Sequence, residues 1–440
     1  MMRNQHLLLR FFIISIALVS CKTGSVNLFK AVSPHEQYQR KLVSAGLDKT
    51  AMGSAWISSA SSSIQKALNI TIPYKETGYF AADKIPVATY KFAATKGQKL
   101  TISITKKPRT SASLYLDVWQ LRTDGTAKIV AYADTLNNPL QYEVDETGHY
   151  AIRLQPELLQ SVQYNLEINI GPSLAFPTQT KTSTSIQSYW GDGRDNNARK
   201  HEGIDIFGKF RSPVLAIAEG TITRVNENNL GGRVVWLKPK GKDYTIYYAH
   251  LDEQIATVGQ EVKVGDTIGL MGNTGNARTT PTHLHFGIYT FGGAINPLPF
   301  IDPITKIPKN VVAPISNLNK TLRASTSVKL LNAPDQNAIV IEVLKASTIM
   351  NISSATGNFY KTELPDGKIG FVNSSALNQI TSSLRKVKIN PTQQTVYDQP
   401  DELAAIKNTL ALGQMVNVLG HFGNFQLISD QNSKVGWIVQ

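Results

Sequence analysis

The 440-residue sequence contains a single cysteine, Cys21, so no disulfide bond can form within the chain. Near the N-terminus, an apolar stretch at residues 11–19 lies between Arg10 and Lys22, and it is well short of the ~20 residues that a membrane-spanning helix needs. The sequence has no long basic run and no nucleic-acid-binding motif. These absences argue against a disulfide-stabilised fold, against a spanning helix at this position and against nucleic acid as a partner.

The N-terminal residues have the features of a targeting segment, which is not part of the fold. Arg3 and Arg10 supply positive charge, and the apolar stretch ends in the sequence Leu-Val-Ser-Cys at residues 18–21. This ending resembles the processing site of bacterial lipoproteins. Because Cys21 has no cysteine to pair with, we expect it to be lipidated, and an ordinary cleaved signal peptide with an incidental cysteine is the alternative.

Residues 1–21 are therefore predicted to be a lipoprotein signal segment. The mature chain is predicted to be anchored to a membrane of the cell envelope by its lipid and to face the periplasm. The chain has 45 Lys and Arg against 32 Asp and Glu, a net charge of +13, which suits an anionic envelope as partner. A solvated, lysine-rich surface would give the same balance.

The length predicts two to four domains, and a hydrophobic content of 42% indicates ordered domains instead of disorder. Residues 22–69 are polar and serine-rich, so we expect mostly a tether, with room for a short helix around residues 36–45. Residues 70–175 contain alternating runs separated by turn signals, such as Lys99–Ile104 and Tyr164–Ile168. This pattern predicts a β-sandwich domain with a binding or spacer role.

An internal repeat occupies the C-terminal part of the chain. Its landmarks are the pairs Pro334-Asp335 and Pro400-Asp401, Gly357-Asn358-Phe359 and Gly423-Asn424-Phe425, and Gly370-Phe371-Val372 and Gly436-Trp437-Ile438. Since 400 − 334, 423 − 357 and 436 − 370 all equal 66, two copies of one unit follow each other without a net insertion. Both copies, residues 318–379 and 384–440, are predicted to be small β-barrels, and they resemble bacterial Src-homology-3-type modules.

Four of the eight histidines and one aspartate fall within 85 residues in the middle of the chain. These five residues are His201, Asp205, His250, His283 and His285. Imidazoles and a carboxylate suit zinc, and a set of three protein ligands leaves a position for water. The pattern therefore predicts a metal site that can support catalysis.

The local sequence predicts that these residues lie on strands. Residues 282–289 alternate in character, which sends His283 and His285 to one face. His201 and Asp205 share a face in a strand or a helix, but Gly203 and its two isoleucine neighbours favour a strand. Glu202 would then point away from the metal. This argues against a helical His-Glu-x-x-His site, in which the glutamate is the general base.

Together these motifs resemble the lysostaphin-type (LytM-like) zinc endopeptidases, which cut peptidoglycan peptides. The resemblance rests on His201-x-Gly203-x-Asp205, Tyr248-Ala249-His250-Leu251 and Thr282-His283-Leu284-His285-Phe286, and it covers roughly residues 185–300. It implies a peptidase domain at residues 176–305. It also implies that His201, Asp205 and His285 are zinc ligands, and that His250 and His283 face the bound water and the developing oxyanion as catalytic residues.

The sequence thus predicts a mostly β, multidomain chain: a β-sandwich, a LytM-like β-rich peptidase domain and two small β-barrels. Its predicted function is zinc-dependent hydrolysis of the peptide cross-links of bacterial peptidoglycan. Two alternatives stay open, namely a non-catalytic LytM-like activator of other wall hydrolases and a wall-binding scaffold that uses the β modules alone.

Overall fold

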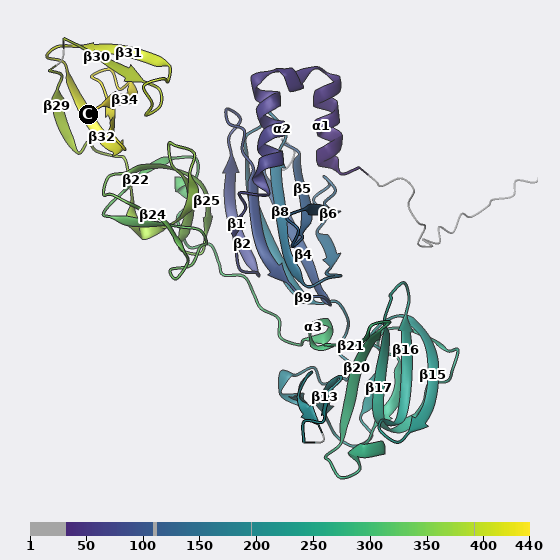
Figure 1. The fold of residues 1–440 in the computed structure, drawn as a ribbon. Coiled ribbons are helices and arrows are strands. Elements are labelled where there is room, and N and C mark those ends of the chain that lie inside the picture. The colour runs from purple at the N-terminus through teal and green to yellow at the C-terminus, as the bar shows by residue number, and fades with distance from the viewer. Residues whose placement is uncertain (1–31, 109–111, 195, 391) are drawn as a thin grey trace, which may run out of the picture. The chain divides into compact units, whose positions relative to one another are not determined.

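The computed structural model describes residues 32–108, 112–194, 196–390 and 392–440 (Figure 1). Strands dominate it, which confirms the prediction of a mostly β chain with several sheets. The predicted signal segment and the predicted lipidation site, Cys21, lie outside the described residues. Among the residues that are described, no helix combines the length and the apolar character needed to cross a membrane.

Two helices precede the sheets. They are α1 (Pro34–Ser44) and α2 (Ala51–Ser63), with the 3-10 turn η1 (Leu47–Lys49) between them. The side chain of Ser33 accepts a hydrogen bond from the backbone N–H of Glu36, and Thr50 caps α2 in the same way. The buried Trp56 of α2 donates its indole N–H to the carbonyl oxygen of Pro156 at 2.8 Å. Helix α2 is therefore held against the following β domain.

These helices differ from the tether expected for residues 22–69. The serine-rich composition suggested a solvated segment, but Leu42 and Trp56 supply a small apolar face that packs on Tyr115. The helices begin at cap residues of the usual kind, Ser33 followed by Pro34 for α1 and Thr50 for α2. The free energy gained by burying a few large apolar side chains is enough to fold this segment, although most of its residues are polar.

The strands between residues 68 and 172 form two layers around one core. The first layer has the order β1-β3-β8-β5-β6, and the second is the series β2-β9-β4-β7 of a larger sheet. These strands are β1 (Leu68–Asn69), β2 (Tyr74–Phe80), β3 (Ala88–Ala94), β4 (Gln98–Lys107), β5 (Leu114–Leu121), β6 (Ala127–Tyr132), β7 (Leu140–Glu143), β8 (Gly148–Pro156) and β9 (Val162–Pro172). Alternate residues of both layers fill the core between them, as in a sandwich.

A ten-stranded sheet follows, with the main order β10-β13-β20-β17-β16-β15-β18. Its strands are β10 (Ile186–Ser188), β13 (Ile204–Phe207), β14 (Pro213–Leu215), β15 (Gly220–Asn228), β16 (Gly232–Pro239), β17 (Thr245–Gln254), β18 (Glu261–Val262), β19 (Thr267–Met271), β20 (His283–Thr290) and β21 (Gly293–Ile295). The short hairpin of β11 (Gly193–Arg194) and β12 (Arg199–Lys200) precedes β13, and α3 (Leu298–Ile301) follows β21. The 3-10 turns η2 (Ser183–Ser185) and η3 (Gly275–Ala277) lie in the connections.

The C-terminal strands repeat with the offset found in the sequence. The first copy contains η4 (Ile315–Asn317), β22 (Thr321–Ala324), β23 (Val328–Leu331), β24 (Val340–Leu344), β25 (Ile349–Thr356), β26 (Phe359–Glu363), β27 (Ile369–Asn373), η5 (Ser374–Ala376) and β28 (Leu377–Gln379). The second contains β29 (Arg385–Lys388), β30 (Gln393–Tyr397), β31 (Ile406–Ala411), β32 (Met415–Phe422), β33 (Phe425–Ser429) and β34 (Val435–Val439). Strands β24, β25, β26 and β27 each begin 66 residues before β31, β32, β33 and β34. The internal repeat is therefore a repeat of strands.

The two copies differ in what they pair with. Strand β25 pairs with β2, so the first copy belongs to an eleven-stranded sheet with the main order β24-β23-β27-β26-β25-β2-β9-β4-β7, and β22 pairs with both β25 and β28. The second copy forms a six-stranded sheet of its own, with the order β29-β32-β33-β34-β30-β31. In the described part of the chain neither strand order closes on itself, so the expected barrels are open sheets.

Candidate metal centre

Three neighbouring strands bring the sequence motifs together. Strand β20 lies between β13 and β17, and Asp205 is directly opposite His285 in the register of β13 and β20. On the other side of β20, His285 is opposite Ala249, the residue before His250. His201 precedes β13 by three residues, and its side chain returns to the same place. Residues 84 positions apart in the chain thus meet on one face of the sheet.

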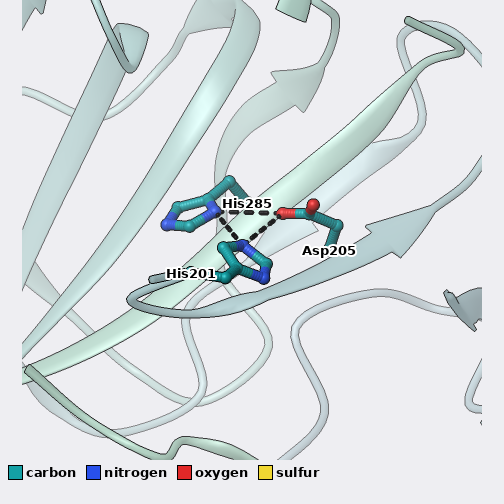
Figure 2. A group of neighbouring side chains, drawn as sticks. All are labelled: His201, Asp205 and His285. Atoms are coloured by element: carbon teal, nitrogen blue, oxygen red, sulfur yellow. Dashed lines mark hydrogen bonds and ion pairs between the residues drawn. The ribbon is translucent and has the colours of Figure 1, made fainter. Parts of the chain in front are cut away.

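His201, Asp205 and His285 point toward one another (Figure 2). The Oδ1 atom of Asp205 lies 3.1 Å from Nε2 of His201 and 3.0 Å from Nδ1 of His285. The two imidazole nitrogens are 3.0 Å apart. One ligand-type atom from each residue therefore falls within a group less than 4.8 Å across, a size that a single metal ion can bridge.

Backbone carbonyls orient three of the imidazoles. The Nδ1 atom of His201 lies 2.9 Å from the carbonyl oxygen of Tyr189. His250 and His283 place Nδ1 2.8 Å from the carbonyl oxygens of Thr274 and Pro281. A carbonyl oxygen only accepts, so each Nδ1 carries the hydrogen and donates it. In all three residues the lone pair is then on Nε2, the state needed to bind a metal or to accept a proton.

His250 and His283 lie beside the group of three. The Nε2 atom of His283 is 4.0 Å from Oδ1 of Asp205. The ring of His250 has its centre 4.9 Å from that of His283 and 5.8 Å from that of His285. His250 also has a positive φ of 63°, a backbone state that few non-glycine residues adopt. Such strain is found at functional sites, where the surrounding structure enforces it.

Burial and neighbouring charges set the protonation of this group. Burial alone would raise the pKa of Asp205, but its close contacts with the imidazoles of His201 and His285 outweigh the effect of burial, and the pKa lies well below the usual range. Burial lowers the pKa of His285, and burial together with His283 and His285 lowers the pKa of His250 to about 4. At neutral pH the site therefore holds the ionised carboxylate of Asp205 beside the neutral imidazoles of His250 and His285, and this state favours metal binding.

Two further residues, Gly203 and Arg194, support the site. A Cβ at Gly203 would lie 2.6 Å from the carbonyl oxygen of Phe286 and 2.7 Å from Cε1 of His285, so only glycine leaves room for that ring. The guanidinium of Arg194 holds Oδ2 of Asp205 at 2.8 Å, which leaves Oδ1 facing the imidazoles. The sequence shows the glycine, but no spacing rule predicts the arginine. Glu202 is exposed, as expected for a residue pointing away from the site.

The donor set fits zinc. Two imidazole nitrogens and one carboxylate oxygen form a ligand set of the kind that zinc uses in catalytic sites, where a fourth position is kept for water or substrate. The carboxylate has its second oxygen held by Arg194, and His201 has its second nitrogen held by a carbonyl. These outer contacts are typical of ligands that are fixed in place before the metal binds.

Comparisons with known proteins concern this part of the chain. Residues 199–297 match the model of peptidase family M23. The chain is 41% identical over 101 residues to an uncharacterized metalloprotease of Haemophilus influenzae, a match that covers 23% of this chain and 21% of that protein. It is 36% identical over 128 residues to the L-Ala–D-Glu endopeptidase of Bacillus subtilis, with 27% of this chain and 39% of that protein covered.

A third relative, the murein hydrolase activator NlpD of Escherichia coli, is 36% identical over 102 residues, which cover 23% of this chain and 26% of that protein. The matches thus span at most 39% of the length of these three relatives. The chain carries a peptidase M23 domain, and this domain contains all five residues of the metal site and its surroundings.

Proposed function

We propose that this chain is a zinc-dependent endopeptidase that hydrolyses the peptide cross-links of bacterial peptidoglycan. The observation that carries the proposal is the complete group of His201, Asp205 and His285 with His250 and His283 beside it. Family M23 is a family of zinc-dependent metallopeptidases. One relative is named an endopeptidase for the L-Ala–D-Glu bond, which supports a wall peptide as substrate.

His201, Asp205 and His285 would hold the metal through Nε2, Oδ1 and Nδ1, the atoms that converge. A bound zinc ion would lower the pKa of a water ligand to about 7 and polarise the scissile carbonyl.

His250 and His283 are the proposed catalytic residues. Their Nδ1 hydrogens are engaged by carbonyls, so each presents an Nε2 lone pair to the reacting groups. One of them can accept the proton of the attacking water and return it to the leaving amine. A protonated imidazole at this position also stabilises the negative charge on the tetrahedral oxygen. The lowered pKa of His250 keeps that ring neutral, and hence able to accept a proton, at neutral pH.

A different role has support from one relative. The E. coli relative is named an activator of murein hydrolases, so a non-catalytic M23 domain that activates another hydrolase is the second candidate. The presence of both ligand-type and proton-accepting residues in one cluster favours the enzyme.

We also propose that the chain is anchored to a membrane of the cell envelope through a lipid on Cys21 and faces the periplasm. A Pseudomonas aeruginosa relative, 36% identical over 107 residues, is named a lipoprotein, which supports this placement. Labelling of the intact chain with a radioactive fatty acid would test it, with Cys21→Ser as the control that should lose the label.

Metal dependence separates the two candidate functions. The purified chain should contain about one zinc per molecule and release soluble peptides from purified peptidoglycan, and chelation should stop this release until zinc is restored. An activator would release nothing by itself but would increase the release caused by an added wall amidase. Activity that persists in the chelated protein would overturn the metallopeptidase proposal.

A further inference from the structure

A second site lies far from the metal centre in sequence, on the outer face of the five-stranded sheet. Helices α1 and α2 contact β5 and β8 of this sheet (Figure 1). His35 of α1 is hydrogen-bonded to Gln155 at 2.7 Å, and Trp56 of α2 donates to the carbonyl oxygen of Pro156. A cavity of about 830 Å³ lies between the helices and the strands, and His35 is part of its lining. Its volume is within the range of sites for small molecules, ~300–1,000 Å³.

Strand alternation defines the floor of this cavity. Trp119 and Leu121 of β5 lie two residues apart, and Ile129 of β6 is paired with Trp119 in the register. All three side chains are half-buried and line the cavity. They form an apolar strip that the helices leave uncovered, which is the character expected of the surface under a bound ligand.

Polar atoms without partners are concentrated beneath this strip. Six buried side-chain nitrogen or oxygen atoms in the described residues have no hydrogen-bond partner within the protein, and four of them belong to this sheet face. The four are Thr89 Oγ1, Asp117 Oδ1, Trp119 Nε1 and Arg153 Nε. A buried polar atom without a partner costs ~1–3 kcal/mol, so its retention calls for an explanation.

Arg153 is the central member of this set. It is 6% exposed, its Nη1 donates to the carbonyl oxygen of Ala60 at 3.2 Å, and its Nη2 pairs with the carboxylate of Asp117. Its Nε–H stays unpaired, and both Arg153 and Trp119 line the cavity. The guanidinium carbon lies 5.2 Å from the centre of the Trp119 ring. Arg153 and the Trp119 ring beside it thus each carry an N–H group without an acceptor in the protein.

The charge at the cavity is positive. Lys91 and Arg122 line it, and no ion pair is found for either of them among the described residues. Glu36, the acidic residue on the lining, is already paired with Arg40 at 2.6 Å. Asp117 balances the charge of Arg153. An incoming carboxylate would therefore meet the cations of Lys91 and Arg122, with the unpaired N–H groups of Arg153 and Trp119 buried among the lining residues.

We propose that this cavity binds a short peptide through its free terminal carboxylate, with the apolar strip of Trp119, Leu121 and Ile129 beneath the peptide. This rests on the proposed function, because the peptide available to a wall endopeptidase is an uncrosslinked stem peptide of peptidoglycan. The domain would then hold the enzyme on the wall by binding the free ends of stem peptides that are not cross-linked.

Calorimetric titration of the full chain tests the proposal, in a His283→Ala background so that no peptide is hydrolysed. The probes are a synthetic stem tetrapeptide with a free C-terminal carboxylate, the same peptide with a C-terminal amide, and inorganic phosphate. We expect the acid to bind at least tenfold more tightly than the amide. Equal binding of acid and amide would overturn the proposal, and so would phosphate that displaces the peptide, since that would show a general anion site.

Variants locate the binding. Arg122→Gln and Lys91→Gln should each lower the affinity for the peptide with a free carboxylate by about fivefold. This is the loss expected for a partly exposed ion pair of ~1 kcal/mol. Lys128→Gln is the matched control, because Lys128 is next to Ile129 on β6, faces the other way and does not line the cavity. Ile129→Trp should fill the floor and abolish binding, provided that its thermal unfolding matches that of the parent. Unchanged affinity in both charge variants would contradict the proposed site.

The outcome is separable from that of the proposed function. Binding is measured by calorimetry in the His283→Ala background, and cleavage of soluble cross-linked fragments is measured with the unaltered chain. If the acid peptide binds but no cross-link is cleaved, the cavity site stands and the enzyme proposal falls. If cross-links are cleaved but the acid and the amide bind alike, the enzyme stands and the cavity site falls.

Discussion

Two of the carboxylates that are buried in the described residues have surroundings that differ in kind. Glu76 of β2 is fully buried and accepts hydrogen bonds from four hydroxyl groups, those of Tyr74, Tyr90, Tyr164 and Ser354, at 2.5–2.9 Å. Asp205 of β13 is 8% exposed and faces the imidazole nitrogens of His201 and His285. Both carboxylates are compensated, but only Asp205 is surrounded by atoms that can bind a metal.

The surroundings of Glu76 complete its hydrogen bonding within the protein. Its hydroxyl donors come from β2, β3, β9 and β25, and Lys361 adds a contact of 2.6 Å to the hydroxyl of Tyr90. No capacity for a ligand remains, so this cluster joins the first C-terminal repeat to the sandwich. Burial of a carboxylate does not indicate function by itself. The groups that surround the carboxylate, hydroxyls at Glu76 and imidazoles at Asp205, indicate whether it can bind a metal.

The largest expected effect is at the metal ligands. Replacing His285 with Ala removes one of three converging ligand atoms, so we expect bound zinc and turnover on peptidoglycan both to be lost. Metal analysis and peptide release should be measured on the same preparation. Zinc retained at one per molecule in this variant would contradict the assignment of His285 as a ligand.

The next effect separates ligands from proton-transfer residues. His283→Ala and His250→Ala should keep zinc and lower turnover on the order of 10²-fold or more, since each residue supplies acid–base or oxyanion help. Zinc content and initial rates should be compared with those of the parent. Loss of the metal in either variant would mean that the roles are exchanged.

Glu76→Gln should affect stability instead of catalysis. The change removes the carboxylate that most favours the charged form of the buried Lys361, and the loss of a buried charge partner lowers the free energy of unfolding by about 3 kcal/mol. Urea denaturation measures this, with zinc content and turnover expected to be unchanged. The matched control is Glu167→Gln on β9, whose carboxylate pairs with Lys75 at the surface and should cost less than ~1 kcal/mol.

If Glu76→Gln instead lowered turnover while the unfolding curve stayed the same, the distinction between the two carboxylates would be wrong.

The smallest effect is expected at Glu202. Its side chain is exposed and lies outside the group of five, so Glu202→Gln should keep its zinc and a substantial part of its turnover. In a helical zinc peptidase the glutamate of such a motif would be indispensable. A fully metallated but inactive variant would show that the strand interpretation of this motif is incorrect.

The sequence predicts the parts of the site that depend on local periodicity. Alternation along residues 282–289 places His283 and His285 on one face, and the structure has both on β20 with Asp205 opposite His285. The role of Arg194 could not be predicted, because its contact with Asp205 depends on how a separate hairpin folds back. The left-handed backbone of His250 also has no local signal.

The fold, like the site, has features that the local sequence predicts and features that it does not. The offset of 66 residues recurs in the starts of four strand pairs, since a repeat is a property of the sequence itself. The helices at residues 34–63 were expected to be mostly tether, because the average composition concealed a small apolar face. The pairing of β2 with β25 joins residues nearly 280 positions apart, and nothing local specifies such a contact.

Mass spectrometry of the fragments released from defined, cross-linked muropeptides tests the central claim most directly. The zinc-loaded chain should convert cross-linked dimers into monomers by hydrolysing one peptide bond, with the mass of one water added for each bond cut. The His283→Ala variant, with the same zinc content, should leave the dimers intact over the same period. Dimers that stay intact with the parent chain, or that are cut equally by both proteins, would contradict the account.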